Sequence, residues 1–246
     1  MYTILISMLI GAATGGVWTA LELWKGWQMG IVLFVLVSLV SFIVISRIMA
    51  KRVEAPFMAI QKQIQAGQTQ LAIAALEDMM PLSRWQVLLK GQLHAQIGLL
   101  AFAAGDEQRA LEHLPKAGLR ATEAKLAHAS LEYRRGRKAQ ALEAVDTAIR
   151  ANKKQIMPYH VYAWMLAKDG DREGAINKLV QAEKVEKSNE STQENLARLR
   201  NGKKLNMKRF GMAWFGLQLE KPPAQYRGGQ GMTGRKGFRQ KPQRKR

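Results

Sequence analysis

The sequence predicts an all-α protein built from two transmembrane helices, an α-solenoid of about four helix pairs and a basic, largely disordered tail. Three observations predict this order. Two uncharged apolar runs begin the chain, a glycine–alanine spacing recurs four times in its middle, and lysine and arginine gather at its end. We expect a transmembrane hairpin over residues 1–50, a helical repeat domain with a capping helix over 53–202, and the tail over 203–246.

Two long runs without a charged side chain, Met1–Leu21 and Gly26–Ser46, predict the membrane helices. Each run has 21 residues, and a helix needs about 20 to cross the hydrocarbon core. The first run contains Gly11, Gly15 and Gly16, and small residues let two membrane helices approach closely. We therefore expect these glycines to pack against the second helix.

The first apolar run has an alternative interpretation as a cleaved signal peptide. Such a peptide usually begins with a positively charged stretch. No lysine or arginine precedes the apolar residues here, so we favour a retained membrane helix.

The basic residues near the second apolar run indicate its direction. Arg47, Lys51 and Arg52 follow this run, whereas the connection between the two runs has only Lys25. The loops on the cytoplasmic side of membrane proteins carry the excess of lysine and arginine. We therefore expect an integral protein of the bacterial inner membrane with both termini in the cytoplasm.

A recurring spacing in the middle of the chain predicts four helical repeats. A glycine is followed five residues later by an alanine, and four residues after that by leucine or valine. The glycine permits a tight turn between two antiparallel helices, and the larger side chain fills their shared core. Each pair leaves an apolar face open, which the next pair covers. The four sets are Gly67/Ala72/Leu76, Gly105/Ala110/Leu114, Gly136/Ala141/Val145 and Gly170/Ala175/Leu179.

Over about residues 56–187, this pattern resembles the tetratricopeptide repeat (TPR) family. Gly98 falls on the glycine of the first helix in the second repeat, and Tyr159 falls on an aromatic position in the fourth. The sequence departs from the family where His94 and Lys125 stand at aromatic positions. The resemblance implies a TPR-like solenoid, and short helical repeats of a related type are the alternative.

A further helix is predicted after the last repeat. Ser191–Glu194 has the residue types of a capping box, and Leu196 and Leu199 lie on one face of the helix it would begin. The helix is expected to end at Asn201–Gly202. Its polar outer side suits the cap that a terminal repeat needs.

The resemblance implies that the first helices line a concave surface for a peptide or helix of a protein partner. When the helix register of the family is transferred to this sequence, Leu99 and Glu123 lie on this surface. The candidate partner-binding residues are Phe102, Tyr133, Arg134, His160, Trp164 and Lys168. Aromatic rings beside arginine and lysine suit a segment that carries carboxylates. The alternative is that the aromatic residues pack between helices.

The C-terminal segment is strongly basic. Residues 201–246 contain 13 lysines or arginines and one acid, Glu220, and so carry +12 of the formal charge of +19. We expect the last 26 residues to be disordered when free. Such a tail can contact RNA, anionic lipid or an acidic protein, or remain solvated. The candidate residues for contact with nucleic acid or lipid are Arg235, Lys236, Arg239, Lys241, Arg244, Lys245 and Arg246.

The sequence predicts no catalytic, metal or cofactor site. The chain has no cysteine, which excludes disulfides, thiolate metal sites and cysteine nucleophiles. The four histidines lack the His-Glu-x-x-His spacing of a zinc site. Gly228–Gln230 resembles the loop with which peptide-chain release factors hydrolyse peptidyl-tRNA, but the domain that presents that loop has no counterpart here. We expect a protein that is not an enzyme.

Two functions fit these observations. The first is a membrane-anchored, TPR-like scaffold or assembly factor that binds a protein partner at the cytoplasmic face of the membrane. The alternative is a membrane tether for RNA or ribosomes that acts through the basic C-terminal tail.

Overall fold

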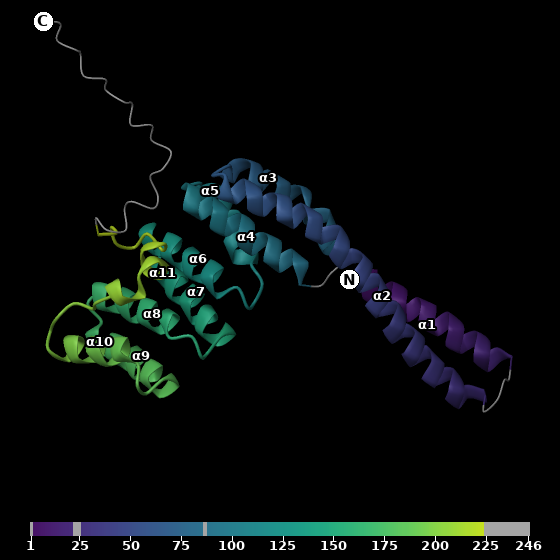
Figure 1. The fold of residues 1–246 in the computed structure, drawn as a ribbon. Coiled ribbons are helices and arrows are strands. Elements are labelled where there is room, and N and C mark those ends of the chain that lie inside the picture. The colour runs from purple at the N-terminus through teal and green to yellow at the C-terminus, as the bar shows by residue number, and fades with distance from the viewer. Residues whose placement is uncertain (1, 22–25, 86–87, 224–246) are drawn as a thin grey trace, which may run out of the picture.

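The computed structural model describes residues 2–21, 26–85 and 88–223 (Figure 1). Within these ranges every regular element is a helix and no strand occurs, which confirms the all-α prediction. Figure 1 shows a long helical hairpin at one end of the molecule and a curved stack of shorter helices at the other.

The hairpin consists of α1 (Tyr2–Ala20) and the first half of α2 (Gly26–Gln65). Both helices are long and apolar enough to cross a membrane. Their outer faces carry large apolar side chains, and Leu9, Leu36 and Val40 are 69%, 53% and 56% exposed. Hydrocarbon is a favourable surrounding for such a surface, whereas water is not.

Two glycines of α1 let the hairpin helices touch. A Cβ atom on Gly11 would lie 2.6 Å from the carbonyl oxygen of Phe34, and one on Gly15 would lie 2.6 Å from that of Gly30. The expected packing of these glycines against the second helix is confirmed. Gly16 differs from the expectation, because a Cβ atom there would have no neighbour within 4 Å.

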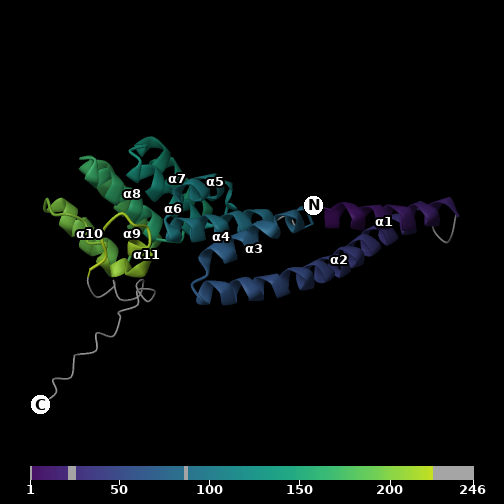
Figure 2. The same cartoon turned by 90° about the horizontal axis from the view of Figure 1, so that it is seen from above.

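α2 continues without interruption from the hairpin into the repeats. Its 40 residues run past Arg47, Lys51 and Arg52 to Gln65, and Pro56 lies inside the helix. Figure 2 shows α2 as a single bowed helix. The second half of α2 is the first helix of the first repeat, so the expected boundary between residues 50 and 53 falls within one helix.

The first turn of α1 is fixed to the repeats. Thr3 Oγ1 donates a hydrogen bond of 2.7 Å to the carbonyl oxygen of Trp85. The rings of Tyr2 and Trp85 meet edge to face with centroids 5.6 Å apart. The hairpin is therefore joined to the repeats at two points, through α2 and through these contacts.

Four antiparallel helix pairs and a terminal helix form the solenoid, as predicted. The pairs are the second half of α2 with α3 (Thr69–Asp78), α4 (Leu89–Ala104) with α5 (Glu107–His113), α6 (Thr122–Arg134) with α7 (Lys138–Ala151), and α8 (Met157–Lys168) with α9 (Arg172–Val185). The short helices η1 (Met80–Arg84) and η2 (Leu114–Lys116) follow α3 and α5, and α10 (Glu190–Arg200) packs on α9.

The turn inside each pair is made by the predicted glycine. Gly67, Gly105, Gly136 and Gly170 have φ angles between 73° and 92°, a region that strains other residues. The alanines and the leucines or valine of the recurring spacing are at most 1% exposed. The pattern therefore predicted both the turns and the core between the two helices of each pair.

The terminal helix α10 begins two residues before the predicted start. Asn189, rather than Ser191, is the N-cap, and its Oδ1 accepts a hydrogen bond of 3.1 Å from the backbone N–H of Thr192. Asparagine and serine cap helices about equally well, so the residue types alone did not separate the two positions. The helix ends before Gly202 as predicted, with φ 73° at this glycine.

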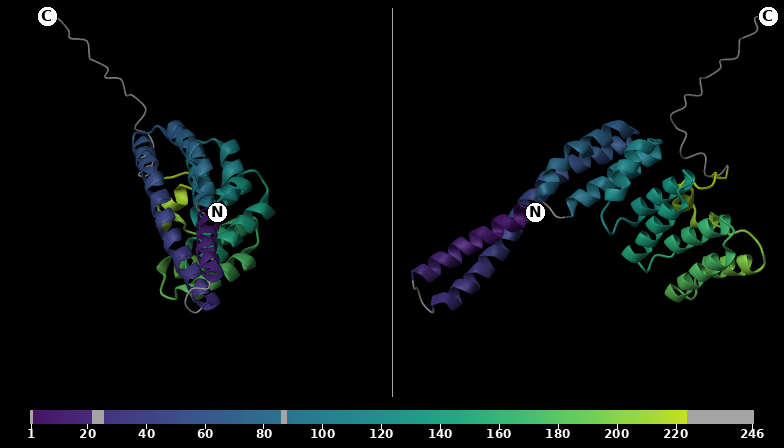
Figure 3. Two further views of the ribbon diagram at one scale, coloured as in Figure 1. Left: turned by 90° about the vertical axis from the view of Figure 1, so that its right-hand side faces the viewer. Right: turned by 180° about the vertical axis from the view of Figure 1, so that it is seen from behind.

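The segment after α10 is ordered, which corrects the prediction of a largely disordered tail from residue 203. It contains η3 (Lys208–Phe210) and α11 (Met212–Phe215), and Figure 3 shows it on the inner side of the stack. Met207, Trp214 and Leu217 are at most 6% exposed and join a core cluster with α6, α7 and α8. We call residues Lys203–Glu220 the strap. Residues 224–246 lie outside the described part of the chain.

Candidate partner-binding groove

The six predicted partner-binding residues all lie on the first helices of their repeats. Phe102 is on α4, Tyr133 and Arg134 are on α6, and His160, Trp164 and Lys168 are on α8. Two of them meet directly, because the rings of Tyr133 and Trp164 are 5.7 Å apart. Phe102, His160 and Trp164 are at most 6% exposed, so these three side chains offer little surface to a partner.

The strap covers the C-terminal ends of α4 and α6. Gln218 Nε2 donates a hydrogen bond of 3.2 Å to the carbonyl oxygen of Phe102. Arg134 Nη1 donates one of 2.6 Å to Gln218 Oε1, and Arg134 also pairs with Glu107. Arg134, which the sequence predicts to bind a partner, is thus bound by Gln218 and Glu107 of the same chain.

The strap also fills the aromatic site on α8. The indole rings of Trp164 and Trp214 have centroids 5.1 Å apart. Their Nε1 atoms donate hydrogen bonds of 3.0 and 3.1 Å to the two carboxylate oxygens of Glu220. Lys168 Nζ lies 5.3 Å from the centre of the Trp164 ring. Glu220 therefore occupies the position that the sequence predicts for a carboxylate of the partner.

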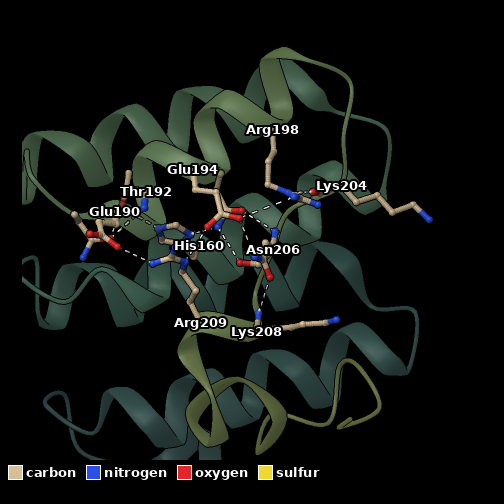
Figure 4. Close-up of polar contacts among 11 residues, drawn as sticks. His160, Glu190, Thr192, Glu194, Arg198, Lys204, Asn206, Lys208 and Arg209 are labelled. Atoms are coloured by element: carbon tan, nitrogen blue, oxygen red, sulfur yellow. Dashed lines mark hydrogen bonds and ion pairs between the residues drawn. The ribbon is translucent and has the colours of Figure 1, made fainter.

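The start of the strap is attached to α10 and α8 through a buried polar network (Figure 4). The Asn206 N–H donates a 2.6 Å hydrogen bond to Asn195 Oδ1, and Asn195 Nδ2 lies 3.2 Å from both the Asn206 carbonyl oxygen and His160 Nδ1. His160 Nε2 lies 3.0 Å from Thr192 Oγ1. Burial lowers the pKa of His160 to about 4. His160 is therefore a neutral internal connector at pH 7.

Two acids of α10 bind the basic part of the strap, as Figure 4 shows. Arg209 Nη1 lies 2.8 Å from a carboxylate oxygen of Glu190, and Arg209 Nε lies 2.8 Å from one of Glu194. The hydrogen bond from Asn206 to Glu194 and the charge of Arg209 lower the pKa of the Glu194 carboxyl. These exposed ion pairs fix the path of the strap and add little stability.

Beside the strap, the concave side remains open in two adjoining hollows. A hollow of about 390 Å³ lies between α2 and α4, and one of about 610 Å³ lies between α4, α6, the start of α8 and α11. Leu99 lines both hollows, so we treat them as one feature, the open groove. Its apolar lining includes Phe57, Met58, Ile60, Ile64, Leu100, Phe102, Leu126, Ile156, Met157, Met212 and Leu217.

The sequence located only part of the open groove. Leu99, Phe102 and Glu123 were assigned to the concave surface, and all three line it. The contribution of α2 was missed, although Phe57 and Ile64 recur at helical spacing on one face of that helix. The contribution of α11 depends on the docking of the strap, which no local pattern indicates.

The histidines of α4 and α5 form a buried pair. His94 Nδ1 lies 3.1 Å from His113 Nδ1, and burial is the main cause that lowers the pKa of both rings. In this contact one ring donates a hydrogen bond and the other accepts it, so the pair links α4 and α5. Within the described ranges, no group of three or more histidine, aspartate or glutamate side chains could hold a metal ion.

The basic residues predicted for nucleic acid or lipid contact, from Arg235 to Arg246, lie outside the described residues. The contact of this tail with RNA or lipid stays a prediction.

Comparisons with known proteins add a structural likeness. No family model matches the chain, and no curated protein matches it. Among solved structures, a chain described as "MamA RS-1 ArsTM double mutant" matches with a TM-score of 0.47 and 15% sequence identity. The match covers 67% of this chain and 92% of that chain. We assign no function from it, and the helix pairs described above are the basis for the TPR-like repeat fold.

Proposed function

We propose that this protein is a membrane-anchored, TPR-like scaffold or assembly factor without catalytic activity. Its open groove binds a segment of a protein partner at the cytoplasmic face of the bacterial inner membrane. The observation that carries the proposal is that the groove begins on α2, the same helix that forms half of the apolar hairpin. Membrane attachment and partner binding thus share one continuous element.

The hairpin supports the membrane anchor and its direction. Small residues close the contact between α1 and α2, and the outward faces carry exposed aliphatic side chains. Arg47, Lys51 and Arg52 are all exposed directly after the apolar half of α2. Basic residues at this place favour a cytoplasmic location for the repeats and for both termini.

The partner segment that fits the open groove is an amphipathic helix. The groove is lined mainly by apolar side chains, and helices lay an apolar face into such grooves. Its charged lining residues are acidic, Glu54 at one end and Glu123 at the other, so lysine or arginine should flank the apolar face of the partner. The site for an acidic segment is already filled by Glu220.

The place of the groove favours a partner that is itself at the membrane. At 1.5 Å of rise per residue, Glu54 lies about 12 Å beyond Ser46, the last residue of the uncharged run, and Ile64 lies about 27 Å beyond it. The juxtamembrane part of another membrane protein can reach this span without leaving the surface.

A pair of matched variants tests the proposal. Met58 in the groove and Leu71 on α3 are both 57% exposed, so a glutamate at either position should have a similar small effect on folding. We expect Met58→Glu to abolish co-purification of a membrane protein from detergent extracts, and Leu71→Glu to retain it. If both variants retain the same proteins, the groove is not the binding site.

A further inference from the structure

The two ends of the solenoid differ in what they face. The second half of α2 runs away from the hairpin. Within every repeat, the second helix runs in the opposite direction to the first. The glycine turns inside the pairs therefore lie at the far end of the stack, and the connections between pairs lie at the end that faces the hairpin. The views in Figures 1 and 3 agree on this arrangement.

The connections between pairs expose two leucines. Leu88, before α4, is 76% exposed, and Leu119, between η2 and α6, is 79% exposed. These are the highest values among the large apolar side chains of the described ranges. Neither leucine contributes to the repeat core or to the open groove, so both require another explanation.

A close backbone contact holds these two connections together. The Gly118 N–H donates a hydrogen bond of 3.1 Å to the carbonyl oxygen of Gly91. A Cβ atom on Gly91 would lie 2.7 Å from the Cα of Gly118, so only glycine fits there. Leu88 lies shortly before Gly91, and Leu119 directly follows Gly118. Both leucines therefore belong to one edge of the stack. Trp85, which touches the first turn of α1, lies on the same connection.

The same edge is basic. Lys90 and Arg120 are exposed beside the two leucines, and Lys153 and Lys154 are exposed in the connection between α7 and α8. Lys116 lies 3.5 Å from Glu112, so its charge is partly offset. Exposed leucines among exposed cations are the combination that binds the surface of an anionic bilayer.

We propose that the connections between the repeats form a lipid-docking edge. Leu88 and Leu119 enter the interfacial layer of the bilayer, and Lys90, Arg120, Lys153 and Lys154 contact anionic headgroups. This inference rests on the membrane anchor of the proposed function, because the hairpin brings the edge to the surface. Docking would fix the tilt of the solenoid and hold the open groove beside the membrane.

Single cysteine labels can test the docking, because the chain has no cysteine of its own. The full chain would carry a fluorophore at Leu119→Cys, at Val40→Cys in the hairpin, or at Gln68→Cys in the far turn. Each labelled protein is placed in nanodiscs of phosphatidylcholine, with or without phosphatidylglycerol, that contain spin-labelled quencher lipids. We expect quenching at positions 40 and 119 and none at 68, with stronger quenching at 119 in the anionic discs.

Charge variants measure the electrostatic part. Each basic residue near an anionic surface corresponds to about a five-fold change in the ratio of docked to undocked domain. Lys90→Gln combined with Arg120→Gln should therefore lower this ratio by about 25-fold. Lys62→Gln combined with Arg135→Gln removes the same charge from exposed positions away from the edge, and should leave quenching at position 119 unchanged.

The outcomes separate this inference from the membrane anchor. Quenching at position 40 without quenching at 119 would overturn the docking edge and leave the anchor intact. Absence of quenching at position 40 would overturn both. Equal quenching at 119 in the two kinds of disc, or equal effects of the two charge variants, would contradict the role of anionic lipid.

Discussion

Replacement of Trp214 by alanine should loosen the strap and lower the stability of the repeats. Trp214 is fully buried, packs against the Trp164 ring and donates a hydrogen bond to Glu220. Truncation of a buried aromatic residue to alanine costs about 3–5 kcal/mol. For a folded unit of this size, 1 kcal/mol corresponds to about 2–4 °C in melting temperature. We therefore expect a decrease of about 6–20 °C.

The assay is thermal unfolding of the full chain in detergent micelles, followed by far-ultraviolet circular dichroism. Trp214→Phe is the matched control, because it keeps a buried ring and removes the hydrogen bond to Glu220. Its melting temperature should lie between those of the wild type and Trp214→Ala. Trypsin should also cleave after Lys203 or Lys204 faster in the alanine variant than in the wild type. Melting temperatures within about 2 °C for Trp214→Ala and the wild type would refute the packed strap.

Three further predictions concern the hairpin, a buried histidine and the tail. Gly11→Ala should destabilise the hairpin by about 1–3 kcal/mol, because its Cβ would meet the Phe34 carbonyl, whereas Gly16→Ala should be neutral in the same unfolding assay. His160 has a folded pKa of about 4 against about 6.5 when unfolded. The unfolded state thus takes up a proton first as the pH falls from 6.5 to 4, and stability should decrease by about 3 kcal/mol; His160→Asn should lack this part of the pH dependence in urea titrations. A chain that ends at Pro223 should keep the wild-type melting temperature, and one that ends at Gly202 should not. Loss of RNA crosslinking in the Pro223-terminated chain would support the tail as an RNA contact, and retention would contradict it.

The local patterns predicted the repeat fold well. Each turn between two helices needs a glycine with positive φ, and each helix crossing needs an alanine. Because both requirements are local, they are visible in the spacing of Gly136 and Ala141. The start of α10 was misplaced because Asn189 and Ser191 are both good caps. These features depend on residues a few positions apart.

The strap was not predictable in the same way. Its charges dominate the composition, and the aromatic residues between them, such as Trp214, become core residues only when α6, α7 and α8 form a surface to receive them. For the same reason, the sequence left open whether Trp164 binds a partner or packs between helices, and it assigned His160 to the partner surface although the structure buries this side chain. Burial there depends on a segment about 50 residues further along the chain.

The continuity of α2 was only partly visible in the sequence, which indicates that the first repeat begins close to the end of the second apolar run but not that one helix forms both. The change from apolar to mixed composition after Ser46 indicates the membrane boundary, and Pro56 is a residue that usually breaks helices. In the structure the helix continues through both. The groove residues Phe57 and Ile64 consequently lie on the same helix as the second apolar run.

Site-specific photo-crosslinking can identify which protein segment binds in the open groove. A photo-reactive amino acid would replace Met58 in the open groove or, as the control, Leu71 on the outer face of α3, and crosslinked peptides would be identified by mass spectrometry of isolated membranes. We expect position 58 to capture the juxtamembrane segment of one membrane protein, with apolar residues at helical spacing and basic flanks, and position 71 to capture no such segment. Capture of the same peptides from both positions, or of none from position 58, would contradict this expectation.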